Sequence, residues 1–488
     1  MTTVKKDIIQ ALLEKKFLLN LSFLQILDEK EEQELQEFFE KIQEKEKEEI
    51  TTYIKNFKKI QDTSNKTKEG TVSIVYSLES KDIKKTIGDF VSYFNSRYKH
   101  LESMLRNRQE LQGITSIKRI SQKDEKETVS IIGLVKNIEE TKNNNFIITL
   151  EDQTGEIKII INNTKKELIE EAKTIVFDEV IGVVGVSVGN AVFANKIIWP
   201  DIPIYNELKK SPDEEFAVFL SDIHIGSKQF LQKDFEKFIK WINGELGNEK
   251  QQEIVKKIKY VFVVGDVVDG VGIYPGQEKD LEIKDIKEQY DLCAHFLRMI
   301  PSNIKIIICA GNHDAMRLAE PQLPLYYDHA RSLYDMPNVI MVSNPSIVNI
   351  AKTKTFQGFN VLLYHGYSFD YYIANVDEIR NNGGYDRADL VMKFMLKRRH
   401  MAPTHTSCMY IPFPDHDPLI ITKIPDFFAT GHLHKVSVSN YRNITLIGSS
   451  CWQAKTSFQE KMGHNPEPSR VPLVNLQTRE VKIMRFGD

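Results

Sequence analysis

The chain has 488 residues, more than one hydrophobic core usually organises, so we expect about two to four domains. Hydrophobic residues make up 41% of the sequence and charged residues 27%, and no apolar stretch approaches the roughly 20 residues that span a bilayer, so no membrane partner is expected. The formal net charge of -3 gives no general attraction for a polyanion, and the four cysteines form no C-x-x-C pair, which argues against a disulfide framework and a zinc ribbon.

The N-terminal region is predicted to be helical and tethered. It begins without the apolar core of a signal peptide, so we expect a cytoplasmic protein. Apolar residues at helical spacing on a background rich in Glu and Lys predict a small helical module over 1–61. The polar run that follows has nothing to bury, which predicts a flexible linker over 62–80.

A helical connector is predicted over 81–126. Its main element is an amphipathic helix over 81–108, whose apolar stripe includes Ile87, Val91 and Tyr98. We expect this stripe to pack against a neighbouring domain.

Residues 127–200 are predicted to form an OB-fold domain. Their pattern changes to five short strands, which is the number that an OB barrel needs, and a helix-like segment falls between the third and fourth strands. An unrelated small β-barrel is the alternative. Phe146 is the one aromatic residue in the first three strands, so a protein contact is favoured over single-stranded DNA binding. The predicted strands are 129–135, 146–150, 157–161, 180–186 and 191–198.

Five short, mostly apolar runs in the second half of the chain are typical of strands that are buried on both faces. They cover 217–220, 260–264, 305–309, 361–364 and 426–430, and each ends beside residues that can bind a metal ion. Because ligands gather at the carboxyl ends of strands in open α/β sheets, we expect these side chains to converge at one sheet edge as a metal centre. The residues are Asp222, His224, Asp266, Asp269, Asn312, His313, Asp314, His365, His432 and His434.

The types and spacing of these residues favour a metal centre over chance. Asp222 and His224 are two positions apart, so both can face one ion, and a carboxylate such as Asp266 can bridge two cations. Five of the 12 histidines fall at these strand ends. Taken alone, His365 would more often be a buried, hydrogen-bonded core histidine, and Asp222 would more often be a helix N-cap. Chance is a poor explanation for five such motifs in one chain. Ligation by Asp, Asn and His without thiolate suits Mn²⁺, Fe²⁺, Ni²⁺ or Zn²⁺.

This ordered set of motifs resembles the calcineurin-like metallophosphoesterase family. The resemblance implies an α/β four-layer fold, with two sheets flanked by helices, in a phosphodiesterase domain over 211–488. It also implies two divalent metal ions, with manganese favoured, and hydrolysis of a phosphodiester. By this resemblance one metal would be held by Asp222, His224, Asp266 and His434, and the other by Asp266, Asn312, His365 and His432.

The same resemblance implies roles for three neighbouring residues. His313 would not bind metal but would stabilise the transition state or protonate the leaving oxygen. Asp314 would orient the imidazole of His313. Asp269 would either accept a hydrogen bond from a ligating histidine or cap the following segment.

Further motifs at 93–98, 397–403 and 451–459, with the OB-like segment before the phosphoesterase, are similar to those of the small subunits of archaeal D-family DNA polymerases. The resemblance implies a metal-dependent 3′–5′ exonuclease that proofreads DNA 3′ ends. It also implies a scaffold for the large catalytic polymerase subunit, with the N-terminal module contacting other replication proteins. In the related eukaryotic B-subunits the ligand residues are degraded, whereas here each position carries a competent residue, so we expect retained activity.

Four basic residues on one predicted helix are candidates for DNA phosphate contacts, with a solvated helix face as the alternative. They are Lys393, Lys397, Arg398 and Arg399. Other functions also fit the ligand set. One is a non-catalytic polymerase scaffold, and another is a phosphatase that acts on phosphoproteins. A stand-alone double-strand-break repair nuclease would normally place the phosphoesterase near the N-terminus, whereas about 210 residues precede it here.

Overall fold

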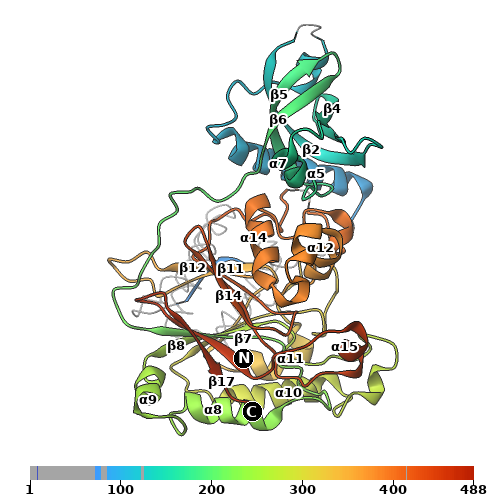
Figure 1. Cartoon of the computed structure of the whole chain (residues 1–488). Coiled ribbons are helices and arrows are strands. Elements are labelled where there is room, and N and C mark those ends of the chain that lie inside the picture. Colours follow the sequence, from blue (N-terminus) through green and yellow to red (C-terminus); the bar gives the residue numbers. More distant parts are fainter. Residues whose placement is uncertain (1–7, 9–71, 79–84, 123–125, 414, 488) are drawn as a thin grey trace. The chain divides into compact units, whose positions relative to one another are not determined.

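The computed structural model describes Ile8 and residues 72–78, 85–122, 126–413 and 415–487 (Figure 1). The helical module predicted over 1–61 and most of the predicted linker lie outside the described residues. Among the described residues, no helix combines the length and the apolar composition that crossing a membrane requires.

The end of the predicted linker is a strand. Strand β1 (Ser73–Tyr76) pairs antiparallel with β11 (Ser346–Ile350) at the edge of a sheet. Val75 and Tyr76 pack against the hydrophobic core on that sheet. The linker prediction is therefore wrong for these residues, because sheet pairing and apolar packing fix this backbone.

Helix α5 (Ile87–Arg106) forms within the segment predicted as an amphipathic helix, and Thr86 and Asp89 form a capping box at its start. The short helix α6 (Ile117–Ser121) follows. The predicted apolar stripe is wrong at its beginning, since Ile87 is 86% exposed and Val91 58%. The buried face instead includes Arg97, whose guanidinium forms an ion pair of 2.7 Å with Asp417.

Five strands form the closed barrel that the sequence predicted. Their order is β2-β3-β4-β6-β5, and helix α7 (Lys166–Ala172) lies between β4 and β5 in the chain, as an OB barrel requires. Alternate residues such as Ile157, Ile159 and Ile161 point into the barrel core. The strands are β2 (Thr128–Glu140), β3 (Phe146–Asp152), β4 (Gly155–Ile161), β5 (Val180–Val188) and β6 (Ala191–Ile198).

The remaining strands form two six-stranded sheets. The first has the order β10-β9-β8-β7-β16-β17 and the second β1-β11-β12-β13-β15-β14. The five runs predicted as buried strands are β7 (Phe216–Leu220), β8 (Ile258–Val264), β9 (Lys305–Cys309), β12 (Phe359–Leu363) and β13 (Phe427–Thr430). The other strands are β10 (Val339–Met341), β14 (Ser437–Tyr441), β15 (Ile444–Gly448), β16 (Arg470–Asn475) and β17 (Val481–Arg485).

The two sheets face each other and helices cover their outer faces, which gives four layers (Figure 1). Phe219 and Phe262 from one sheet meet Phe427 from the other in the central core. Outside the first sheet lie α8 (Gln232–Ile242), α9 (Glu249–Val255), α10 (Ile286–Arg298) and α11 (Tyr327–Tyr334). Outside the second lie α12 (Phe369–Asn375), α13 (Asp377–Asn381) and α14 (Ala388–Arg398), and the other helices are α15 (Ser457–Met462), η1 (Gln277–Lys279), η2 (Gly384–Asp386) and η3 (His405–Ser407).

Candidate metal centre

The predicted ligand residues come from both sheets. Asp222, Asp266 and Asn312 follow β7, β8 and β9 of the first sheet, whereas His365 follows β12 and His432 follows β13 of the second. The expectation of one sheet edge is therefore wrong. The donors meet because the carboxyl ends of the central strands in the two facing sheets open on the same side.

The backbone at these strand ends is strained. Fourteen non-glycine residues in the described part of the chain have positive φ, and five of these are Asp222, His224, Asp266, His432 and His434. A left-handed conformation is uncommon for a residue with a Cβ, and such residues gather at functional sites where the surrounding structure fixes them.

Glycines leave the space that these side chains fill. Gly265 has φ +82°, and a Cβ there would overlap the ring of His365 and the backbone of Gly311. A Cβ at Gly311 would in turn overlap the carboxylate of Asp266. Only glycine allows the strand ends to approach this closely.

One group of donors consists of Asp222, His224 and His434, whose ligand atoms all lie within 4.8 Å of one another. Nε2 of His224 lies 3.1 Å from Nε2 of His434, which lies 3.3 Å from Oδ1 of Asp222. Nδ1 of His224 donates to Oδ1 of Asp269 at 2.9 Å, so the lone pair of His224 is on Nε2. Of the two roles left open for Asp269, the structure thus shows the contact with a histidine.

A second group consists of Asp222, Asp266 and His365, again within 4.8 Å. Nε2 of His365 lies 3.2 Å from Oδ2 of Asp266 and 3.1 Å from Oδ1 of Asn312. Nδ1 of His365 donates to the carbonyl of Val264 at 2.8 Å, which directs the lone pair of Nε2 into the site.

His432 is oriented by a carboxylate that the sequence did not single out. Nε2 of His432 donates to Oδ2 of Asp370 on α12 at 2.9 Å. Because that nitrogen carries the proton, Nδ1 has the lone pair. The ring lies beside His365, with 5.4 Å between ring centroids, and the backbone N–H of His432 donates to Asp222 at 3.0 Å.

The ring of His313 is held differently from the prediction. Its Nδ1 donates to the backbone carbonyl of Asp269 at 2.9 Å, which leaves Nε2 free. Asp314 accepts from the N–H of Gly311 at 2.8 Å and from the hydroxyl of Tyr290 at 3.2 Å. The prediction that Asp314 orients His313 is therefore wrong, because its carboxylate points back to shape the turn after β9.

The electrostatics of the cluster fit divalent cations. Burial alone would raise the pKa of Asp266, but His365 and His313 bring that pKa well below its ordinary range. Burial alone would lower the pKa of His365, but Asp266 raises it to about 10, so without metal Nε2 carries a proton that a bound cation would displace. The buried carboxylates therefore require positive charge, and the nitrogen and oxygen donors without thiolate suit Mn²⁺, Fe²⁺, Ni²⁺ or Zn²⁺.

The four basic residues predicted to contact DNA lie away from this cluster, and two of them are buried. Arg398 forms an ion pair of 2.6 Å with Glu179 of the barrel, and Arg399 donates to the carbonyl of Ile421 at 2.8 Å. Lys397 lies over the ring of Trp199, with its Nζ 3.8 Å from the centroid, and Lys393 is paired with Asp389 at 2.9 Å. The DNA-contact prediction is wrong for Arg398 and Arg399, because both guanidinium groups join parts of the fold.

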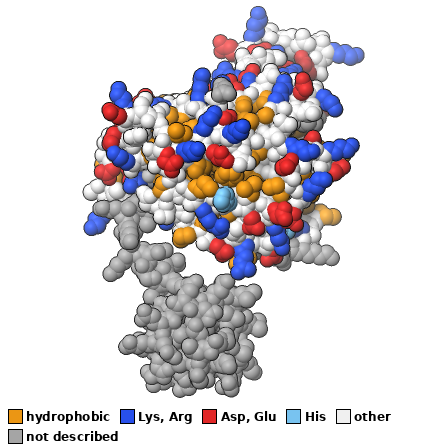
Figure 2. Space-filling model, turned by 90° about the horizontal axis from the view of Figure 1, so that it is seen from below, with side chains coloured by type: hydrophobic (Ala, Val, Ile, Leu, Met, Phe, Trp, Pro, Cys, Tyr) orange, Lys and Arg blue, Asp and Glu red, His pale blue; other side chains and the backbone are white. Residues whose placement is uncertain are grey.

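The described residues on the face drawn in Figure 2 form no continuous strip of Lys and Arg side chains. Among the described residues of that face, Lys and Arg side chains alternate with Asp and Glu around a central group of hydrophobic side chains. This mixture agrees with the net charge of -3 and offers little non-specific attraction for phosphates.

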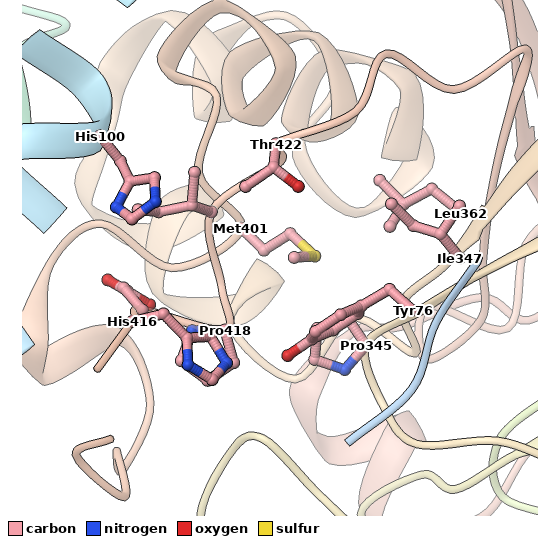
Figure 3. Close-up of a pocket in the computed structure, with 11 residues that line it drawn as sticks. Tyr76, His100, Pro345, Ile347, Leu362, Met401, His416, Pro418 and Thr422 are labelled. Atoms are coloured by element: carbon pink, nitrogen blue, oxygen red, sulfur yellow. The ribbon is translucent and has the colours of Figure 1, made fainter. Parts of the chain in front are cut away.

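A cavity of about 290 Å³ opens over the donor cluster and is lined by His224, Asp266, Asn312, His313 and His432, among others. A second cavity, drawn in Figure 3, lies where Tyr76 and His100 face apolar side chains such as Leu362 and Met401. Its volume of about 50 Å³ is enough for a few water molecules but not for a nucleotide. The cavity over the cluster is the candidate substrate site because residues of the possible metal-binding groups line it.

Several residues that contact the candidate ligands or line the cavity were not identified as site residues from the sequence. Gln453 donates to Asp269 at 2.9 Å, and Nε2 of Gln459 lies 3.0 Å from Nδ1 of His434. Both belong to the segment 451–459, which the resemblance marked without assigning a role. Asp370, Tyr385 and His464 line the cavity and gave no comparable signal, because only the fold brings them together.

Comparisons with known proteins agree on one family. The family model for the B-subunits of DNA polymerases alpha and epsilon matches residues 217–438, and that of the OB-fold nucleic acid binding domain matches 129–189. The DNA polymerase II small subunit of Methanothermobacter thermautotrophicus is 40% identical over 88% of this chain and 83% of its own length. The protein of the same name from Archaeoglobus fulgidus is 39% identical over 82% of this chain and 78% of its own.

Similarity to solved structures is weaker. An archaeal phosphodiesterase is 12% identical and is matched over 55% of this chain and 98% of its own length, with a TM-score of 0.27. A TM-score this low supports no conclusion about function. The sequence relatives confirm the resemblance seen in the motifs: the chain belongs to the family of archaeal DNA polymerase II small subunits.

Proposed function

We propose that this small subunit is a metal-dependent 3′–5′ exonuclease, which hydrolyses phosphodiester bonds at DNA 3′ ends and so proofreads for a D-family polymerase. The observation that carries the proposal is the convergence of the donors, with Asp266 present in two of the three groups that could hold an ion. Asp222, His224, Asp266 and His434 would hold one cation, and Asp266, Asn312, His365 and His432 the other. Manganese is the metal that we favour.

Two bound cations would activate water, polarise the scissile phosphate and neutralise charge on the attacking and leaving oxygens. The chain itself prepares the site for this chemistry. Hydrogen bonds to Asp269, Val264 and Asp370 fix the tautomers of His224, His365 and His432, so that each presents a lone pair. The enzyme would thus lose little free energy to reorganisation when metal and substrate bind.

His313 would handle the proton of the leaving group. Its backbone N–H donates to Oδ1 of Asp266 at 2.7 Å, and Nδ1 is fixed by the carbonyl of Asp269. Nε2 would therefore be free to carry a proton to the leaving 3′ oxygen, next to the carboxylate that would contact both cations.

The proposed partner is the large catalytic subunit of the polymerase. The names of the relatives describe a small subunit of such an enzyme. Within this chain, buried ion pairs join the barrel and helix α5 to the phosphoesterase fold. The barrel belongs to a class that binds nucleic acids, so it is the proposed second contact for DNA or for the large subunit.

Exonuclease polarity tests the proposal directly. With Mn²⁺, the purified protein should remove nucleotides one at a time from the 3′ end of a 5′-labelled single-stranded DNA. Asp266→Ala should abolish this shortening. Asp377→Ala, which changes an exposed carboxylate on α13, serves as the matched control and should keep full activity. Absence of cleavage in both the isolated chain and its complex with the large subunit would favour a non-catalytic scaffold. Hydrolysis of nitrophenyl phosphate without any action on DNA would favour a phosphatase.

A further inference from the structure

One side of the cavity over the donor cluster is aromatic. Tyr385, in η2, and His464, which follows α15, both line the cavity. Their ring centroids are 4.2 Å apart, with 38° between the ring planes, and both side chains are half-buried. Tyr274 and Tyr367 also line the cavity. Aromatic rings that face a cavity offer a surface on which a planar group can stack.

This aromatic side is tied to the proposed metal centre. Tyr385 lines this cavity together with Asp370 and His432, and Asp370 accepts from Nε2 of His432 at 2.9 Å. The Tyr385 ring, which packs against His464, therefore faces the same cavity as a residue that would hold a cation. A group stacked on the ring would have a defined orientation relative to the scissile phosphate.

The lining also indicates what kind of ligand the cavity takes. None of the described residues that line it is Lys or Arg, so a run of phosphates along a strand would find no fixed cations here. The volume of about 290 Å³ lies just below the range of about 300–1,000 Å³ for small-molecule sites. The cavity thus suits one nucleotide whose base stacks, rather than a base pair.

We propose that Tyr385 and His464 form a subsite for the unpaired base of the 3′-terminal nucleotide. This inference rests on the proposed nuclease function, because it places the scissile phosphate at the donor cluster. A paired terminal nucleotide cannot reach the subsite until its base pair opens, and opening is easiest for a mismatched end. The subsite would therefore make the nuclease act faster on frayed and mismatched 3′ ends than on paired ones.

The test measures stacking without turnover. A short single-stranded oligonucleotide ends in 2-aminopurine, whose fluorescence falls when it stacks, and its last linkage is an uncharged methylphosphonate that the site cannot hydrolyse. With Mn²⁺ present, the full-length protein should quench this fluorescence. Tyr385→Ala and His464→Ala should each weaken binding about 5- to 150-fold, the range expected for losing one base–aromatic stack. Tyr385→Phe keeps the ring and should keep the quenching.

The controls separate this inference from the proposed function. Tyr205→Ala, which changes a tyrosine that is 96% exposed and does not line the cavity, should quench as the unchanged protein does. An oligonucleotide with 2-aminopurine at its 5′ end should not be quenched. If the protein cleaves DNA but Tyr385→Ala and His464→Ala quench normally, the subsite is wrong and the nuclease stands. If quenching depends on both rings but no DNA is cleaved under any condition, the subsite stands and the nuclease is wrong.

Discussion

Oδ2 of Asp370 lies 2.9 Å from Nε2 of His432, although the two residues are 62 positions apart and belong to different elements. Asp269 holds His224 in the same way, at the same distance. Each carboxylate fixes which ring nitrogen carries the proton and so leaves the other nitrogen for a metal.

Asp370→Asn should weaken metal binding. The amide is a poorer acceptor than the carboxylate, so His432 loses its fixed tautomer, and the loss of such a contact typically lowers metal affinity by about 10- to 100-fold. Calorimetric titration of the metal-free protein with Mn²⁺ would show the loss as a weaker second site. Asp377→Asn, on the neighbouring helix, should titrate as the unchanged protein does, and equal affinities for all three proteins would exclude the orienting role.

His313→Ala should separate catalysis from metal binding. The ring would act on the leaving oxygen and not on the cations, so kcat should fall by about 10²- to 10⁴-fold while the metal content stays the same. Metal analysis of the purified variant beside its exonuclease kinetics measures both quantities. The exposed His295→Ala is the control for loss of a histidine. Loss of metal in His313→Ala would instead make this residue a ligand.

The ion pair between Arg398 and Glu179 should be important for stability. Arg398→Met removes the cation but leaves the Glu179 carboxylate buried and uncompensated. Breaking a buried pair in this way lowers the free energy of unfolding by about 3–5 kcal/mol. Thermal unfolding should show a lower midpoint, and the addition of Glu179→Gln should restore part of the loss. Lys136→Met breaks an exposed pair with Glu156 and should leave the thermal midpoint almost unchanged, because solvent screens such pairs. Equal midpoints for the two single variants would contradict this assignment.

A buried histidine makes stability depend on pH. Nδ1 of His400 accepts from the N–H of Ala402 at 3.0 Å, and Nε2 donates to Asp417 at 2.8 Å, so the ring is neutral. Burial and the charge of Arg97 lower the pKa of His400 to about 4. As the pH falls, the unfolded chain therefore binds this proton before the folded protein does. The contribution of His400 to the free energy of unfolding is fully present above about pH 6.5 and is lost between pH 6.5 and about 4.

His400→Gln should flatten this dependence, because the amide can donate to Asp417 but cannot titrate. The measurement is the urea midpoint of both proteins between pH 7 and pH 5. The urea midpoint of the unchanged protein should fall further over this interval than that of His400→Gln. Parallel curves would show that His400 does not set the acid sensitivity.

The sequence predicted the strands and most of the cluster because the signals are local. A buried strand reads as a continuous apolar run, and Gly265-Asp266 or Gly431-His432 directly after it marks a close approach at the strand end. The barrel was predicted from five short strands and a helix between the third and fourth, which are also local signals. The strain at Asp222 and His434 is visible only in the backbone of the structure.

What the sequence could not predict depends on contacts between distant segments. Asp370 meets His432 only because a helix and a strand end are brought together, and adjacency misled the prediction for Asp314, whose side chain points away from His313. Arg398 and Arg399 were expected at the surface because arginine is rarely buried without a partner. Their partners come from the barrel and from a distant loop.

The central claim is that two cations share Asp266 between facing sheets. Anomalous diffraction from crystals soaked in Mn²⁺ measures this directly. We predict two peaks about 3.5–4 Å apart, both in contact with Asp266, one beside His224 and His434 and the other beside His365 and Nδ1 of His432. A single peak, or peaks away from Asp266, would contradict the account.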